Sequence, residues 1–109
     1  FAMPSVREGF GIVYPEAMAS GCVTIGTQGE GIADFITDGV NGGLVPPGDP
    51  EALAGYLVRC FTDEAFRRRL ASAGAESARG LTWENNAKRN LALFERLAAE
   101  KKKSGFRTN

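Results

Sequence analysis

The sequence predicts an α/β fold, a parallel sheet with flanking helices followed by one long C-terminal helix. Short runs rich in β-branched residues alternate with segments whose apolar residues recur at helical spacing. A glycine-rich loop follows the first of these runs and leads straight into a helix, as at the carboxyl end of a strand in a parallel sheet. A length of 109 residues limits the chain to one domain, which we expect to be a single partial domain over residues 1–109.

The first half of the chain predicts two strands and two helices. Residues 1–5 are the expected end of a strand, because proline is tolerated at a strand end and cannot donate within the ladder. Residues 12–20 predict a helix, which Gly21 ends as a C-terminal cap. The run 22–26 is apolar enough for a strand buried on both faces, and residues 32–37 predict a short helix.

The middle of the chain begins with turn residues at 38–43 and a very short strand at 44–45. Asp49 is a predicted N-cap, because proline and a second acid follow it. One face of the helix that it starts carries the apolar residues Leu53, Leu57 and Phe61.

Two further helices complete the prediction. Thr62 or Asp63 caps the first of them, with Phe66, Leu70 and Ala73 directed inward and Arg67, Arg68 and Arg69 mostly solvated. Thr82 caps the last one. Its apolar residues recur at helical intervals and predict a buried stripe: Trp83, Ala87, Leu91, Phe94 and Leu97.

Composition excludes several functions. Thirteen basic and thirteen acidic residues cancel, so no bulk charge favours nucleic-acid binding. Histidine is absent, which removes histidine-based acid–base catalysis and histidine metal sites, and we expect neither a metal nor a cofactor. Cys22 and Cys60 lie among apolar neighbours and are expected to be buried free thiols, with a disulfide as the alternative. Free thiols, together with the lack of a signal peptide or a membrane span, favour the cytoplasm.

The most informative stretch runs from Glu8 to Gly21. Gly9 and Gly11 allow backbone angles closed to other residues and let a ligand approach the chain closely. Because the loop opens into a helix, the amides of Gly11, Ile12 and Val13 are expected to be free at the positive end of the helix dipole. Such a place favours an anion, above all a phosphate.

Glu8 precedes that helix, and Glu16 lies about one turn inside it. A carboxylate repels a phosphate but accepts hydrogen bonds from hydroxyls, so a ligand with hydroxyls on both sides of its phosphates suits the pair. The alternative from spacing alone is a simple turn with two surface glutamates, because a short glycine loop is a weak signal.

The same stretch closely resembles the signature of retaining glycosyltransferases of the two-lobed GT-B architecture, group 1. That signature has two glutamates separated by seven residues, as Glu8 and Glu16 are, around Glu-Gly-Phe-Gly and Glu-Ala-Met-Ala-x-Gly. Further agreement extends over residues 39–42, 45–50 and 82–84. The resemblance covers most of the chain and implies the second half of the Rossmann-like, C-terminal, donor-binding lobe.

The resemblance also implies roles for residues. Glu8 would be catalytic, contacting donor-sugar hydroxyls near the reaction centre, although the leaving diphosphate could itself take the acceptor's proton. Glu16 would hold the ribose hydroxyls. Backbone amides would bind the sugar and the diphosphate, and these belong to Gly9, Phe10, Gly11, Ile12 and Val13.

The implied reaction transfers a sugar from a UDP-, GDP- or ADP-linked donor to an acceptor hydroxyl with retention of configuration. The implied partner is the N-terminal acceptor lobe of the same enzyme, which these residues do not include, so we expect an inactive fragment. The family's basic donor-phosphate residues cannot be assigned here. We expect a cytoplasmic enzyme, with a membrane-peripheral place left open, and self-association where the last helix exposes its apolar stripe. A non-catalytic nucleotide or phosphosugar binding module and a ligand-free interaction domain remain alternatives.

Overall fold

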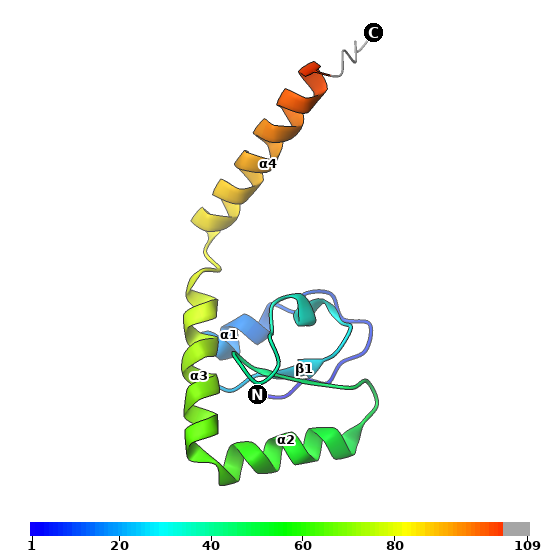
Figure 1. The fold of residues 1–109 in the computed structure, drawn as a ribbon, viewed down its shortest axis with the longest axis vertical. Helices are drawn as coiled ribbons and strands as arrows, with labels where there is room; N and C mark the ends of the chain where they lie inside the picture. Colours follow the sequence, from blue (N-terminus) through cyan, green and yellow to red (C-terminus); the bar gives the residue numbers. More distant parts are fainter. Residues whose placement is uncertain (104–109) are drawn as a thin grey trace. The chain divides into compact units, whose positions relative to one another are not determined.

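The structure is a computed structural model and describes residues 1–103. The chain forms two compact units, Phe1–Arg79 and Gly80–Asn109. The first unit contains the sheet, a short 3-10 helix and three α-helices, and the second contains one long helix (Figure 1). None of the helices over residues 1–103 combines the length and hydrophobicity that crossing a bilayer requires.

The parallel sheet of the first unit joins β1 (Ile25–Thr27) to β2 (Gly43–Val45) in the register Ile25 to Gly43. Ala2 adds an isolated parallel bridge to Ile25 on the other side of β1. The predicted parallel arrangement is therefore confirmed; β1 is shorter than the predicted run 22–26, whereas β2 is one residue longer than the predicted strand 44–45. The first predicted strand is reduced to this single bridge.

Two short helices connect these strands. α1 (Val13–Ala19) begins one residue later than predicted, and Gly21 follows it with a φ of 81°, as a C-terminal glycine cap requires. η1 (Gly31–Asp34) is a 3-10 helix that begins one residue before the short helix predicted over residues 32–37 and ends three residues earlier.

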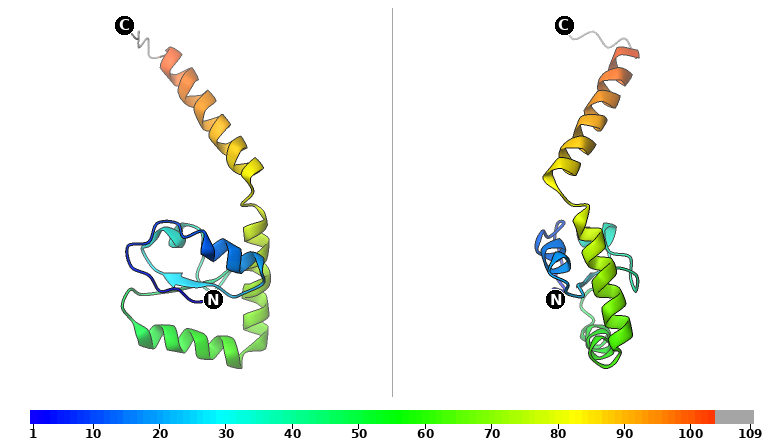
Figure 2. Two further views of the ribbon diagram at one scale, coloured as in Figure 1. Left: turned by 180° about the vertical axis from the view of Figure 1, so that it is seen from behind. Right: turned by 90° about the vertical axis from the view of Figure 1, so that its left-hand side faces the viewer.

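α2 (Pro50–Thr62) and α3 (Glu64–Arg79) form a corner, and α3 packs against both α1 and α2 (Figure 2). The Asp49 carboxylate accepts a hydrogen bond from the Ala52 N–H at 2.9 Å, which confirms that N-cap. Asp63, and not Thr62, caps α3 by accepting from the Phe66 N–H at 2.9 Å.

The core of the first unit has two clusters. The larger lies where α1, η1 and α3 meet, and its buried members are Tyr14, Met18, Ile32, Ile36 and Ala78. The smaller joins the end of α2 to the start of α3 through Cys60, Phe66 and Leu70. Phe66 and Leu70 are buried as predicted, whereas Ala73 is only half-buried.

The predicted apolar face of α2 differs from the one that packs. Leu53 and Leu57 are half-buried, but Phe61 is 79% exposed. Tyr56 and Cys60 make the contacts with the second core cluster, because they lie on the side of the helix turned toward α3.

Two expectations about α3 and the cysteines need correction. Arg68 and Arg69 are exposed, as predicted, although Arg69 also donates to the Gly39 carbonyl at 2.9 Å. Arg67 is instead half-buried, and its guanidinium group donates to the Cys60 carbonyl at 3.0 Å. Both cysteines are free and Cys60 is buried, as predicted, but Cys22 is exposed. Cys22 lies in the turn between α1 and β1, before the strand enters the core.

The second unit consists of α4 (Trp83–Lys103), capped by the Thr82 hydroxyl, which accepts from the Asn85 N–H at 3.1 Å. The predicted buried stripe is wrong for this unit, because Trp83 is 87% and Phe94 is 63% exposed. The reason is simple: over residues 80–103 this unit contains no second helix or strand that could cover the stripe.

Candidate donor-binding site

Residues 8–13, which we call the glycine loop, connect the bridge strand to α1 at the carboxyl end of the sheet. Ile12 is the N-cap of α1, and Val13 is its first residue. Gly9, Phe10 and Ile12 are exposed. The predicted site residues thus form one continuous segment that leads into the helix.

The amides of residues 9–13 have no partner within the part of the chain that the structure describes. No backbone or side-chain group of residues 1–101 accepts a hydrogen bond from the N–H groups of residues 9–13. The first such bond belongs to Tyr14, whose N–H donates to the Gly11 carbonyl at 3.0 Å. Unpaired amides on an exposed loop are available to an anionic ligand.

Glycine is required at one of the two predicted loop positions. Gly11 has a φ of 70°, a left-handed conformation that favours glycine, and a Cβ there would lie 2.6 Å from the Tyr14 ring. Gly9 has neither constraint, since a Cβ there would meet nothing within 4 Å. The Tyr14 ring therefore packs so closely against position 11 that only glycine fits there.

Tyr14 packs against the glycine loop and anchors α1. Its side chain is buried, and its hydroxyl donates to the Met3 carbonyl at 2.5 Å, which ties α1 to the bridge strand. Burial raises the pKa of Tyr14 above its usual value. A hydrogen bond with Ser5 lowers this pKa, and the charges of Glu8 and Glu30 raise it.

The two predicted glutamates differ in their surroundings. Glu8 is half-buried at the start of the glycine loop, whereas Glu16 is exposed in the first turn of α1. Among residues 1–100, no cation pairs with either carboxylate. Both carboxylates therefore remain able to accept hydrogen bonds from a ligand.

One contact was not predicted from the sequence. The backbone N–H of Glu8 donates to Glu30 Oε2 at 2.8 Å, although the two residues are 22 positions apart. The sequence alone allows Glu30 either to be a surface residue or to line the site, and no local pattern indicates such a pairing.

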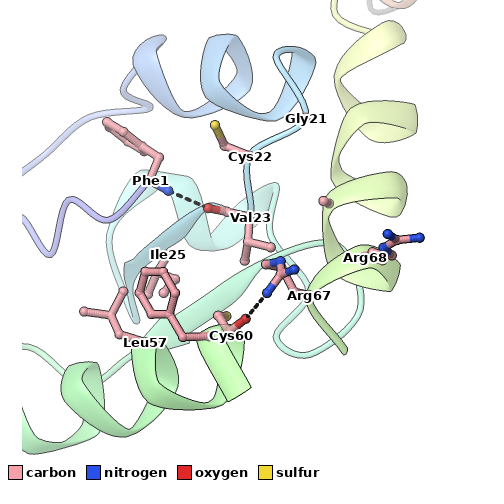
Figure 3. Close-up of a pocket in the computed structure, with 11 residues that line it drawn as sticks. Phe1, Gly21, Cys22, Val23, Ile25, Leu57, Cys60, Arg67 and Arg68 are labelled. Carbon is pink, nitrogen blue, oxygen red and sulfur yellow. Dashed lines mark hydrogen bonds between the residues drawn. The ribbon is translucent and has the colours of Figure 1, made fainter. Parts of the chain in front are cut away.

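A separate pocket of about 390 Å³ lies in the first unit (Figure 3). Its lining includes Phe1, Cys22 and Val23, which lie at or before the start of the paired strands, together with Cys60 and Arg67 from the α2–α3 corner. The glycine loop follows the opposite, carboxyl end of the strands, so this pocket is not the predicted site. Over residues 1–103, no cluster of three or more acidic or cysteine side chains could hold a metal ion.

The parallel strands, with α1 and the glycine loop after their carboxyl end, define an α/β protein with a candidate anion site. Residues 1–77 match the family described as glycosyl transferases group 1. The chain belongs to this family of enzymes.

Two curated relatives illustrate the family. A D-inositol 3-phosphate glycosyltransferase of Nocardioides sp. is 38% identical over 91% of this chain. A phosphatidyl-myo-inositol mannosyltransferase of Mycobacterium leprae is 37% identical over 84% of it. The aligned part of this chain spans only 22% and 24% of those proteins, respectively.

Solved structures agree with the fold. Sucrose-phosphate synthase from Thermosynechococcus elongatus superposes with a TM-score of 0.77 and 36% identity, over 91% of this chain and 25% of that protein. Anabaena HepE in complex with UDP-glucose superposes with a TM-score of 0.73 and 28% identity, over 90% of this chain and 27% of HepE.

Proposed function

We propose that this chain supplies part of the donor site of a retaining glycosyltransferase that moves a sugar from a nucleoside diphosphate to an acceptor hydroxyl. The observation that carries the proposal is the run of unpaired amides over residues 9–13, flanked by Glu8 and Glu16, in a chain of this family. The acceptor lobe would come from further polypeptide, consistent with the small share of each relative that the chain spans.

The glycine loop suits the diphosphate. Gly11, Ile12 and Val13 offer N–H donors at the start of α1, and the missing side chains of Gly9 and Gly11 let phosphate oxygens reach the backbone. Such donors also stabilise the charge that develops on a leaving diphosphate. No lysine is needed in this part of the site, which agrees with the chain's zero net charge.

The two glutamates suit the hydroxyls on either side of that diphosphate. Glu8 would bind hydroxyls of the donor sugar near the reaction centre, and Glu16 would bind those of the ribose. An ionised carboxylate accepts stronger hydrogen bonds than a neutral oxygen does. The HepE complexes with UDP and with UDP-glucose support a nucleotide-sugar ligand, while UDP, GDP and ADP donors all remain candidates for this chain.

The anion site can be tested on the 109-residue chain by NMR titration with UDP, GDP and ADP. We expect amide shifts to concentrate at Gly11, Ile12 and Val13, because these N–H groups would gain phosphate acceptors. Amides at the start of α2, which Asp49 already caps, serve as the internal control. If the amide chemical shifts of the glycine loop stay unchanged up to millimolar ligand, the proposed binding of phosphates by these amides is contradicted.

The role of Glu16 can be tested in the complete enzyme by replacing it with alanine. We expect KM for the nucleotide sugar to rise about tenfold or more, because a charge-assisted hydrogen bond of about 1.5–3 kcal/mol is lost. Glu51→Ala is the matched control, since Glu51 is also exposed and lies in the first turn of another helix. Equal kinetics for the two variants would remove the ribose role of Glu16.

A further inference from the structure

Glu30 reaches from the start of η1 to the glycine loop. Its Oε2 accepts the backbone N–H of Glu8 at 2.8 Å in a partly buried place. A carboxylate that accepts from an amide forms a charge-assisted hydrogen bond, and partial burial limits competition from water. Glu30 therefore holds the backbone of Glu8 itself and leaves the Glu8 carboxylate unused.

The backbone immediately before this contact is strained. Arg7 has a φ of 63°, and it is the one residue other than glycine with a positive φ among residues 1–103. Such a conformation costs on the order of 1–3 kcal/mol and persists only where the surrounding structure holds it. The Glu8 N–H follows directly after Arg7, so its bond to Glu30 stabilises the turn that aims the Glu8 side chain.

Two further contacts hold the next residues of the loop. A Cβ on Gly31 would lie 2.2 Å from the Gly9 carbonyl oxygen, so these backbones already touch. The rings of Phe10 and Phe35 meet edge to face, with centroids 5.8 Å apart. Glu8, Gly9 and Phe10 are thus each held by the segment 30–35.

We propose that Glu30 is a positioning residue for the transfer reaction: it fixes the backbone of Glu8 so that the Glu8 carboxylate is held against the donor sugar. This role rests on the proposed function and extends it to a residue that would not touch the substrate. Glu30 acts on sugar binding through Glu8. The amides at Gly11 to Val13 bind the diphosphate independently of Glu30.

The reason to expect a measurable effect is geometric. Displacing a group in contact with substrate by about 1 Å can cost roughly a hundredfold in rate. Without Glu30, the Glu8 N–H loses its acceptor and the strained turn at Arg7 loses the bond next to it. The Glu8 carboxylate would then sample several positions and rarely occupy the productive one.

The test compares Glu30→Ala and Glu30→Gln with the unmodified complete enzyme. For Glu30→Ala we expect kcat/KM for the nucleotide sugar to fall about tenfold or more, which corresponds to roughly 1.4 kcal/mol. Glu30→Gln keeps an oxygen acceptor and should restore most of the loss. The Kd of the free nucleoside diphosphate, which carries no sugar, should change by less than about twofold.

A double-mutant cycle with Glu8→Ala separates positioning from general damage. The readout is the ratio of the Kd of the nucleoside diphosphate to the Kd of the nucleotide sugar, which isolates the sugar's contribution. Glu30→Ala should lower this ratio in the native background and leave it unchanged once Glu8 is alanine. Asp63→Ala is the control, because it removes a similar carboxylate-to-amide bond at α3, away from the loop.

The outcomes are distinguishable. An active enzyme in which Glu30→Ala leaves kcat/KM unchanged, or lowers the ratio equally in both backgrounds, overturns the positioning role alone. A complete enzyme that neither binds nor turns over any nucleotide sugar overturns the proposed function and this role with it. If Glu30→Ala fails to fold, Glu30→Asp carries the same test, because it withdraws the carboxylate by one methylene.

Discussion

Gly31 shows how closely the segment behind the glycine loop approaches it. A methyl group there would lie 2.2 Å from the Gly9 oxygen and 3.1 Å from the Phe10 nitrogen. Because both neighbours are backbone atoms, Gly31→Ala must displace the loop or η1, and we expect it to lower the free energy of unfolding by about 1–3 kcal/mol.

Chemical denaturation of the two alanine variants Gly31→Ala and Gly55→Ala measures this effect. Gly55 lies within α2, and a Cβ there would meet nothing within 4 Å. Alanine in a helix interior is favoured over glycine by roughly 0.5–1 kcal/mol, so the control should gain stability. A stable Gly31→Ala variant would mean that the loop is not pressed against η1.

At the scale of elements, Tyr56 joins α2 to β2. Its hydroxyl bonds the Gly42 carbonyl at 3.1 Å and Asp38 Oδ1 at 3.2 Å, and a Cβ on Gly43 would lie 2.5 Å from its ring. Burial, and then the negative charge of Asp38, raise the pKa of Tyr56 to about 12. The neutral phenol is therefore the form that the fold favours.

This shift predicts a pH dependence of stability. The pKa of Tyr56 lies higher in the folded state than its ordinary value of 10.0. The stabilisation that this shift gives the folded state is therefore complete below pH 10 and is lost between pH 10 and about 12. The free energy of unfolding should fall more steeply across that window in the native chain than in Tyr56→Phe. If the free energies of unfolding of the two proteins fall in parallel as the pH rises, the raised pKa of Tyr56 is contradicted.

The elements also show which features the sequence could predict. The caps at Asp49 and Thr82 were predictable, because each bonds an amide only three positions away. The pairing of Glu30 with Glu8 was not, because it depends on two segments that meet only in the folded chain. The burial predicted for the stripe that contains Trp83 was wrong for a related reason: helical spacing identifies an apolar face but not what covers it.

At the scale of the whole molecule, both core clusters belong to the unit Phe1–Arg79. Over residues 80–103, the second unit contributes α4 alone, and the large apolar side chains of this helix are exposed: Trp83 by 87%, Leu91 by 58%, Phe94 by 63% and Leu97 by 48%. A single helix in water is marginally stable without packing on its apolar face.

The 109-residue chain should therefore self-associate through α4, because contiguous exposed apolar surface favours burial against another copy. Sedimentation should show a mass that rises with concentration, and serine at Leu91, Phe94 and Leu97 should abolish the rise. Serine at Ala92, Arg96 and Ala99, on the opposite face, is the matched control and should leave it. Residues 1–79 alone should remain monomeric, since they keep both core clusters and lose the helix. A 109-residue chain that stays monomeric at every concentration would show that α4 needs no partner.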